Sequence, residues 1–406
     1  MTTRRLRRVC SGLLALLVVG GARAVSGAPL LVANNGLDGP ATCGSKGAPC
    51  RSISQAIANA QEGDTILVGP GRYGDLNGDG AFDDPGDEAA EVDTGCDCMI
   101  HVDKPVTILS RDGAGATILD AGSASVFVVR IDAGGASLGE VGKGFTVLGS
   151  GDSSGIVALS SAAEIVIAGN RMIGLAGTGL SLLGRGNTAL ANDSIGNAGF
   201  GFFFRLEGGG NSIAGNEAIL NGSGFELRGA RDDLVVGNAA LRNEVDGFRL
   251  LEVSCTFIGD VAAGNLGHGF SLTANSRGVV ILGSVAAGNG RGINVTGDSL
   301  VVSRSSVVGN YGVGVAVHAA ATGIEIEQSN LFGNNGGADL GLTNCGLLNA
   351  SAAPVLAGGN FWGLPNGGVG SDPGDRPCDA AGGFLPTATF SPAARKEIKV
   401  RPRVAQ

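Results

Sequence analysis

The sequence predicts an all-β fold, a single-stranded parallel β-helix whose coils contain about 22–24 residues. The first observation behind this prediction is a repeated phrase, in which an Asn is followed three or four residues later by Gly and an apolar residue. The phrase returns every 21–24 residues, at Asn197, Asn221, Asn243, Asn265, Asn289, Asn310 and Asn334. A period of this size indicates that each repeat is one structural unit, which buries its apolar face by stacking on its neighbours.

The second observation is the alternation of apolar and polar side chains within each repeat. Short alternating strands follow the Asn phrase at residues 224–228, 247–250, 292–296 and 314–318, and a further apolar strand precedes it. Gly and Asn suit the corners of such a coil because they tolerate positive φ, and stacked Asn side chains can hydrogen-bond from one coil to the next. The 73 glycines argue against helical repeats, and the frame of leucine-rich repeats is absent.

The N-terminal end of the stack carries the pattern of a short amphipathic cap helix. Ile53, Ala56, Ile57 and Ala60 are spaced at i, i+3, i+4 and i+7. Ser52 and Gln55 have the spacing of a capping box, which predicts that the helix begins there. A solenoid needs such a cap because its terminal coil otherwise exposes apolar surface and strand edges.

On these residues, together with 50–57, 63–73, 104–109 and 117–120, the chain resembles secreted right-handed parallel β-helix repeat proteins of the pectin-lyase-like superfamily. The resemblance covers most of the mature chain and implies a right-handed β-helix with an N-terminal amphipathic cap helix. It implies little about activity, because this fold serves lyases, hydrolases, adhesins and proteins with no known activity.

We expect one structural domain with four parts. These are a signal peptide at 1–28, an N-terminal strand with cysteine loop and cap helix at 29–64, the β-helix at 65–344 with an acidic insertion at 75–98, and a C-terminal cap and tail at 345–406. The signal peptide is predicted from four arginines, an apolar run at 13–19 and the small-x-small site at 22–24. The protein is therefore expected to be secreted or extracytoplasmic, in the periplasm or at the cell surface.

Charge and hydropathy narrow the choice of partners. The net charge is −9 and becomes more negative once the arginines of the signal peptide are removed, so nucleic acid and anionic membranes are poor partners. No stretch after the signal peptide is long and apolar enough to span a membrane. We expect a monomer.

Seven cysteines follow the signal peptide, and in an exported protein they predict disulfides. Cys345 and Cys378 form the expected pair at the C-terminal end, and Cys255 is expected to be a buried free thiol. The pairing of the remaining four is left open: Cys43, Cys50, Cys96 and Cys98. A zinc site is disfavoured because Cys96 and Cys98 lack the usual two-residue gap and the chain has three His.

The acidic insertion has the spacing of a calcium-binding loop. Asp75, Asn77 and Asp79 take positions 1, 3 and 5, and Asp83 takes position 9. Position 12 is not Glu, so the bidentate ligand would come from a nearby carboxylate such as Asp87. The sequence therefore predicts a structural calcium ion, and the alternative is a solvated acidic turn.

A charged column is predicted on one face of the stack. The residues that precede the repeated Gly on three successive coils are Asp246, His268 and Arg291, which would lie about 4.8 Å apart per step. Beside them, at outward positions of the strands, are Glu226, Arg249, Ser271 and Asn294. The first set could act in acid/base catalysis and the second could bind a ligand. The alternative is a variable exposed corner whose charges compensate each other.

The functional hypothesis is an exported, non-catalytic β-helix that serves as a cell-surface, matrix or carbohydrate-binding element, with a polysaccharide as partner. The alternative is a polysaccharide lyase or glycoside hydrolase that acts on an extracellular glycan through Asp246, His268 and Arg291. Asp232, Asp233 and the Gly-His-Gly phrase at 267–269 are similar to elements of polygalacturonases, but the repeat itself explains these glycines. The resemblance also implies a third hypothesis, a periplasmic accessory factor for a metalloenzyme.

Overall fold

The computed structural model describes residues 28–92, 95–159, 161–334, 344–364, 375–379 and 392–400. The predicted signal peptide, apart from Ala28, lies outside the described residues, as does much of the predicted C-terminal cap and tail. Within the described ranges, no helix has the length and apolar character that crossing a membrane requires.

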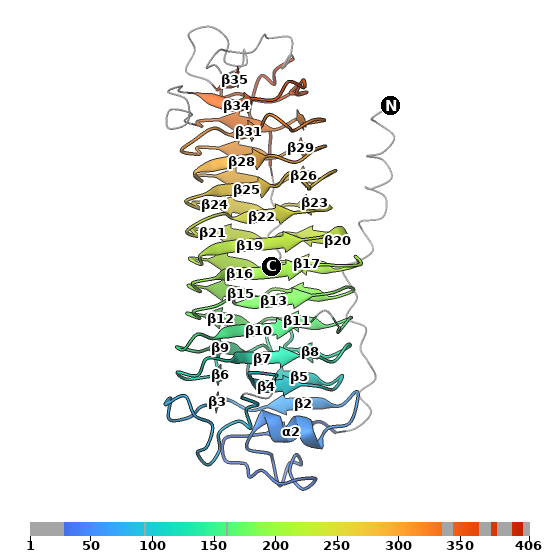
Figure 1. Cartoon of the computed structure of the whole chain (residues 1–406), viewed down its shortest axis with the longest axis vertical. Coiled ribbons are helices and arrows are strands. Elements are labelled where there is room, and N and C mark those ends of the chain that lie inside the picture. The colour runs from blue at the N-terminus through green and yellow to red at the C-terminus, as the bar shows by residue number, and fades with distance from the viewer. Residues whose placement is uncertain are drawn as a thin grey trace.

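The chain coils into a column walled by three sheets of parallel strands (Figure 1). From β2 to β34, successive strands join sheet 1, sheet 3 and sheet 2 in turn, so each coil adds one strand to each wall. The predicted all-β parallel β-helix is therefore confirmed.

Sheet 1 contains twelve strands. In spatial order they are β1 (Leu30–Val32), β2 (Thr65–Val68), β5 (Thr107–Ser110), β8 (Ser137–Leu138), β11 (Val166–Ala168), β14 (Thr188–Leu190), β17 (Ser212–Ala214), β20 (Arg231–Val236), β23 (Ser254–Ile258), β26 (Val280–Leu282), β29 (Val301–Ser303) and β32 (Glu325–Glu327).

Sheet 2 also contains twelve strands. They are β4 (Cys98–Val102), β7 (Phe127–Ile131), β10 (Ser154–Ala158), β13 (Leu180–Leu183), β16 (Phe200–Arg205), β19 (Ser223–Arg228), β22 (Phe248–Leu251), β25 (His268–Leu272), β28 (Arg291–Val295), β31 (Val315–Val317), β34 (Cys345–Asn349) and β35 (Arg376–Asp379).

Sheet 3 has eleven strands. They are β3 (Gly71–Gly74), β6 (Thr117–Asp120), β9 (Thr146–Leu148), β12 (Arg171–Ile173), β15 (Asp193–Ile195), β18 (Glu217–Ile219), β21 (Ala239–Leu241), β24 (Val261–Ala263), β27 (Val285–Ala287), β30 (Ser306–Val308) and β33 (Asn330–Phe332).

Matching residues stack on matching residues inside the column. In sheet 2 the rings of Phe202, Phe225, Phe248 and Phe270 form one buried stack, with centroids 4.7–4.8 Å apart between successive coils. The repeat in the sequence arises from this register, because an apolar residue must recur wherever the strand of the next coil continues the core.

The repeated Asn residues form a buried ladder at the turn between sheets 3 and 2. Asn243 is typical: its backbone N–H and its Nδ2 both donate to Oδ1 of Asn265, at 3.0 and 2.9 Å. A second ladder, which the sequence analysis did not identify, runs through Asn170, Asn192, Asn216, Asn238 and Asp260. Both ladders supply partners for turn backbone that would otherwise be buried without hydrogen bonds.

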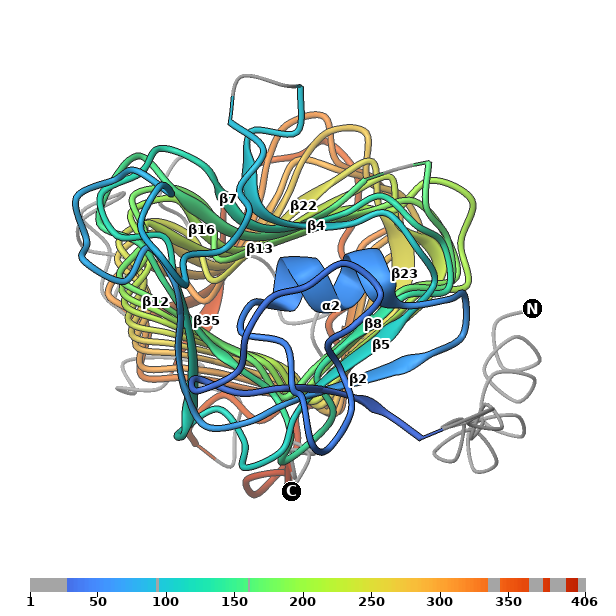
Figure 2. The same cartoon turned by 90° about the horizontal axis from the view of Figure 1, so that it is seen from below.

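The predicted cap helix corresponds to α2 (Ile53–Asn59), which lies at the N-terminal end of the stack (Figure 2). Ile53, Ala56 and Ile57 are buried, and Ser52 Oγ accepts the backbone N–H of Gln55. The reciprocal half of the predicted capping box does not form. The Gln55 amide instead donates to Asn59, and the backbone N–H of Ser52 donates to Asp38, because a carboxylate is the stronger acceptor.

Three disulfides join Cys43 to Cys50, Cys96 to Cys98 and Cys345 to Cys378. The first two lie in the N-terminal part of the chain and the third is near the other end. Cys255 is buried and has no disulfide.

Candidate functional site

The outer face of sheet 2 brings Asp246, His268 and Arg291 onto successive coils. His268 in β25 is the register partner of Arg291 in β28. Asp246 precedes β22, and its Oδ1 accepts the backbone N–H of His268 at 2.8 Å. The three residues are therefore neighbours, as the repeat predicted.

The hydrogen bond of Asp246 limits what this carboxylate can do. Asp246 is 8% exposed, and it satisfies the backbone of the following coil. Its position is therefore that of a turn residue that stabilises the stack, whereas His268 and Arg291 are each partly exposed on the surface.

The second predicted column is also in register. Glu226, Arg249, Ser271 and Asn294 follow one another across β19, β22, β25 and β28. Glu226 differs from the expectation of an outward, accessible side chain, because it is fully buried.

The burial of Glu226 is explained by two arginines. Arg228 Nε donates to Oε1 of Glu226, and Arg249 Nη1 lies 3.3 Å from Oε2. Both arginine side chains remain about half exposed, at 48% and 46%. One carboxylate thus holds two guanidinium groups at the surface, and the cluster presents a net positive charge to solvent.

Neutral hydrogen-bonding groups follow on the next coils. Oδ1 of Asn294 accepts from Arg291 Nη1 at 3.3 Å and lies 2.7 Å from Nε2 of His318. Partial burial and the charge of Arg291 both lower the pKa of His318, which favours the neutral form of this imidazole.

Aromatic side chains flank the arginine pair, and the sequence analysis missed this arrangement. The rings of Phe200 and Phe203 are partly exposed and lie 5.9 Å apart, and the guanidinium of Arg228 is 5.5 Å from the centre of the Phe203 ring. Tyr311, in the turn that leads towards β31, is 73% exposed. Phe203 alternates with Phe202 and Phe204, which face the core, so the sequence pattern could have indicated that the Phe203 ring points outward.

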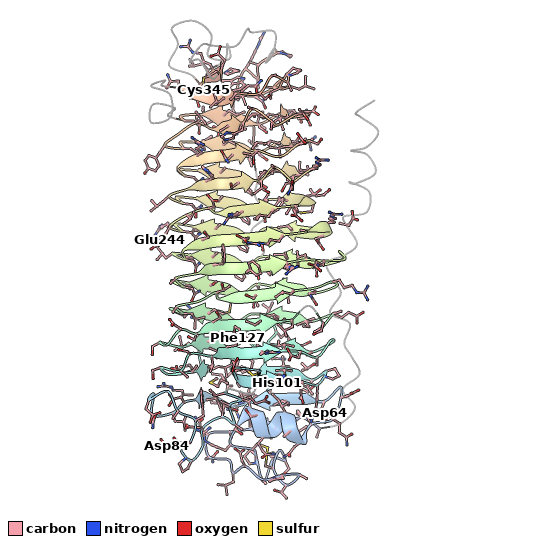
Figure 3. The ribbon with its side chains drawn as sticks, in the orientation of Figure 1. Asp64, Asp84, His101, Phe127, Glu244 and Cys345 are labelled. Carbon is pink, nitrogen blue, oxygen red and sulfur yellow. A yellow bond between two sulfur atoms is a disulfide. The ribbon has the colours of Figure 1, made fainter. Side chains whose placement is uncertain are left out.

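We call this surface the outer strip. It consists of Phe200, Phe203, Glu226, Arg228, Asp246, Arg249, His268, Ser271, Arg291, Asn294 and His318. Towards the C-terminal end, Asn294 is followed on the next coil by Ala316, which belongs to a buried apolar cluster with Val313, Cys345 and Cys378. Cys345 is labelled in Figure 3.

The strands of sheet 2 carry most of the strand arginines. Among the described strands, sheet 2 holds six arginines and two carboxylates, sheet 1 holds one arginine and four carboxylates, and sheet 3 holds two arginines and three carboxylates. Sheet 2 is therefore the wall richest in strand arginines. Arg130 and Arg205 pair with carboxylates just beyond their strands, so Arg228, Arg249 and Arg291 are the ones that can attract anionic ligands.

A second polar cluster surrounds His101 in β4, near the other end of sheet 2 (Figure 3). Its Nδ1 lies 3.1 Å from Glu91 and its Nε2 lies 3.1 Å from Asp132. Partial burial lowers the pKa of His101, but hydrogen bonds with these two carboxylates outweigh that effect and hold the pKa above its ordinary value.

Two groups of side chains in the described ranges could each offer three ligand atoms to a metal ion. In each group, the ligand atoms come from His, Cys, Asp or Glu and lie within 4.8 Å of one another. One group is Cys96, Cys98 and His101, and the other combines Asp38 with the Cys43–Cys50 pair. In both groups the cysteines are joined in disulfides, so their sulfurs are not thiolates in this structure.

The acidic insertion is folded by its own side chains. Asp75 is buried, and its two oxygens accept the backbone N–H groups of Gly78 and Gly80, each at 2.7 Å. Asp87 joins the two ends of the loop, because its oxygens accept the N–H groups of Leu76 and Asp84 at 3.0 Å.

The other predicted calcium ligands lie nearer the surface. Asn77 and Asp79 are exposed and joined by a hydrogen bond of 3.0 Å, and Asn77 also donates to Asp84. Asp83 is exposed. The carboxylates of this loop are not among the three-ligand groups found in the described part of the chain.

The chain matches the family described as "Periplasmic copper-binding protein (NosD)" over residues 146–246 and 207–367. Together these segments span more than half of the chain. The chain belongs to this family. The match covers β9 to β34 and contains the whole outer strip.

Several solved structures are similar to the chain at low identity and low TM-score. A rhamnogalacturonan lyase is 14% identical with a TM-score of 0.43, covering 92% of this chain and 90% of its own. The periplasmic alginate epimerase AlgG is 12% identical with a TM-score of 0.38, covering 66% and 71%. The catalytic unit of a GH87 alpha-1,3-glucanase from Streptomyces thermodiastaticus is 13% identical with a TM-score of 0.44, covering 90% and 71%. No curated protein matches the chain in sequence.

Proposed function

We propose that this chain is an extracytoplasmic, non-catalytic β-helix protein that binds an anionic polysaccharide along the outer strip. The observation that carries the proposal is the concentration of arginines and partly exposed aromatic rings on one wall of an otherwise acidic protein. The predicted signal peptide, the three disulfides and the word periplasmic in the family description support a place outside the cytoplasm.

The strip suits an extended polymer because its groups recur along the stack. Coils follow each other about every 4.8 Å, so a chain lying along the axis would meet a new set of side chains at each step. Arg228, Arg249 and Arg291 can pair with carboxylates of a uronate, since guanidinium groups bind carboxylates in a bidentate manner. Phe200 and Phe203 offer apolar surface for the faces of sugar rings.

The state of the carboxylates supports a non-catalytic role. Glycoside hydrolysis commonly needs two accessible carboxyl groups on either side of the scissile bond. In the outer strip, Glu226 is buried between two arginines and Asp246 is bonded to backbone. A lyase or hydrolase built on Asp246, His268 and Arg291 remains the alternative proposal.

The test is a binding measurement by isothermal calorimetry at low salt. Wild-type protein should bind a polyuronate oligomer and should bind a neutral glucan of equal length at least tenfold more weakly. The double variant Arg249→Gln/Arg291→Gln should lose at least tenfold in polyuronate affinity, and the matched control Arg171→Gln in sheet 3 should not.

Two results would overturn the proposal. Equal affinity for the neutral and the acidic oligomer would show that the arginines are not used. New reducing ends or unsaturated products during incubation, lost in an Asp246→Ala/His268→Ala/Arg291→Ala variant, would establish the enzyme instead.

We also propose that the chain binds copper, as the description of its family says of that family. The specific observation in favour is that Cys96, Cys98 and His101 come together, since thiolate sulfur and imidazole are preferred copper ligands and reduction of the Cys96–Cys98 disulfide would supply the thiolates. Equilibrium dialysis of the whole protein against copper, with and without a reductant, tests the proposal. Retention of no copper in either state would refute it.

For the acidic insertion we propose one structural calcium ion. Its support is the density of oxygen ligands at Asp75, Asn77, Asp79, Asp83 and Asp87, which suits a hard cation. The insertion also contacts the start of α2, where the carboxylate of Glu88 accepts the N–H groups of Ile53 and Ser54 at 2.8 Å. Calcium would thereby stabilise the N-terminal end of the stack.

A further inference from the structure

The group formed by Cys96, Cys98 and His101 lies where the acidic insertion joins sheet 2. Cys98 and His101 belong to β4, and Cys96 precedes it by two residues. Cys96 is 5% exposed and Cys98 is fully buried, so the two sulfurs are sheltered from solvent. One ligand atom from each residue lies within 4.8 Å of the other two.

The backbone around the two sulfurs is held by contacts other than the disulfide. Cys98 exchanges two backbone hydrogen bonds with Glu91, at 2.9 and 3.2 Å. Nη1 of Arg130 donates to the carbonyl oxygens of Gly95 and Cys96, at 2.6 and 3.0 Å. The sulfurs should therefore stay near each other when the bond between them is broken.

A metal that binds the imidazole of His101 must displace one of two carboxylates. Both nitrogens of His101 have a carboxylate at 3.1 Å, Glu91 on one side and Asp132 on the other. A metal that takes one nitrogen leaves the other bonded to a carboxylate, and such a partner fixes the ring and raises its strength as a ligand.

We propose that Cys96, Cys98 and His101 form a copper(I) site when the Cys96–Cys98 disulfide is reduced, and that oxidation to the disulfide releases the metal. This inference rests on the proposed copper binding and names its site and its redox control. Two thiolates and one imidazole are soft donors, which favour Cu(I) over the hard cations expected at the acidic insertion.

A dithiol reductant gives two electrons and two protons to the disulfide bond between Cys96 and Cys98. This leaves two thiols on the protein, and the reductant itself becomes a disulfide. Each thiol releases its proton when its sulfur coordinates Cu(I). Re-formation of the disulfide requires an exogenous disulfide as oxidant: the two thiolates give it two electrons by thiol–disulfide exchange, it leaves as two thiolates, and Cu(I) is released because His101 alone remains as a ligand.

The second group of possible ligands provides the internal comparison. Cys43 and Cys50 have Asp38 in place of a histidine, so the group lacks the imidazole. Nδ2 of Asn59 also contacts both sulfurs, at 3.3 and 3.8 Å, which ties this disulfide to the end of α2. We therefore expect it to remain structural.

The experiment is a Cu(I) titration of the full mature protein under anaerobic conditions, in competition with the chromogenic chelator bicinchoninate. The reduced protein should take one equivalent of Cu(I) from the chelator, and the oxidised protein should take none. Cys96→Ser/Cys98→Ser should abolish this binding, and His101→Gln should weaken it about 10- to 100-fold.

Three controls isolate the site. Cys255→Ser removes the lone buried thiol, Cys43→Ser/Cys50→Ser removes the other N-terminal pair, and His318→Gln removes a histidine of the outer strip. Each reduced variant should still bind one equivalent. If a cysteine variant fails to fold, wild-type protein gives the same answer, because copper X-ray absorption of its reduced, Cu(I)-loaded form should show two sulfur ligands and one imidazole, and His101→Gln should lose the imidazole.

The two proposals fail in different ways. If neither the reduced nor the oxidised protein binds copper, copper binding itself is refuted. If the reduced protein binds copper and the Cys96→Ser/Cys98→Ser variant binds it equally well, or X-ray absorption shows no imidazole ligand beside two sulfurs, the site is wrong and the copper-binding proposal stands.

Discussion

The Asn ladder and the outer strip run along the same coils and use them in opposite ways. In the ladder, one residue type recurs from Asn197 to Asn334 and all its members are buried. In one column of the strip, successive coils carry Phe203, Glu226, Arg249, Ser271 and Asn294. A ladder position favours the same residue on every coil, because its hydrogen-bond partner is that residue one coil away. A surface position has no such partner, so its side chain can vary and can contribute to ligand recognition.

The largest expected effect comes from breaking the ladder. Asn265→Ala removes the acceptor of two buried N–H groups of Asn243 and the donor to the carbonyl of Ala240. Each of these three buried groups costs about 1–3 kcal/mol when it is left without a partner, so the free energy of unfolding should fall by about 3–9 kcal/mol. Urea unfolding followed by circular dichroism measures this. Ser271→Ala on the outer strip is the matched control, and an equal loss there would remove the distinction between the two regions.

The next effect concerns the exception within the second ladder. Asp260 stands where the preceding coils of this ladder carry Asn, and burial raises its pKa to about 7 despite hydrogen bonds from Asn238 that lower it. Between about pH 4 and pH 7 the unfolded chain loses this proton while the folded chain keeps it. The group therefore lowers the free energy of unfolding progressively as pH rises through this window.

Asp260→Asn should consequently stabilise the protein above pH 7, by at most about 4 kcal/mol, and should have little effect below pH 4. Melting temperatures of the variant and the wild type at pH 4 and pH 8 check the prediction. Asp232→Asn, on an exposed side chain of β20, is the control. A variant that is no more stable than wild type at pH 8 would contradict the proposed cost of this carboxylate.

A smaller effect is expected from calcium, which acts at the end of the stack and not on the ladder. Calcium at about 100 times its dissociation constant should raise the free energy of unfolding by about 2.7 kcal/mol, and chelator should remove this gain. Asp79→Asn should reduce the response and Asp152→Asn, an exposed acid outside the insertion, should not. A melting temperature that is the same in calcium and in chelator would refute the site.

The comparison also explains what the sequence could predict. The fold and the register followed from residues that repeat, so the alignment of Arg249 with Ser271 and Asn294 was expected. The burial of Glu226 was not, because it depends on how Arg228 and Arg249 fold over the carboxylate. The second ladder escaped notice because Asn gives way to Asp260 and then to Ser284 and Ser305, which make equivalent hydrogen bonds with different side chains. The group of Cys96, Cys98 and His101 depends on the turn before β4. This turn is not part of the repeat, so its structure could not be predicted from the repeat.

The smallest effect on stability is expected from a substitution in the outer strip that should mainly change the affinity for a polyuronate. Ser271→Arg places an arginine beside Arg249 and in line with Asn294. Like charges on adjacent strands should cost about 0.2–1 kcal/mol, and salt should reduce this cost. If the strip binds an anionic polymer, the added charge should increase polyuronate affinity severalfold, and Ala263→Arg in sheet 3 should not. Because both variants add one positive charge to the protein, an equal gain in both would mean that net charge and not the outer strip determines binding.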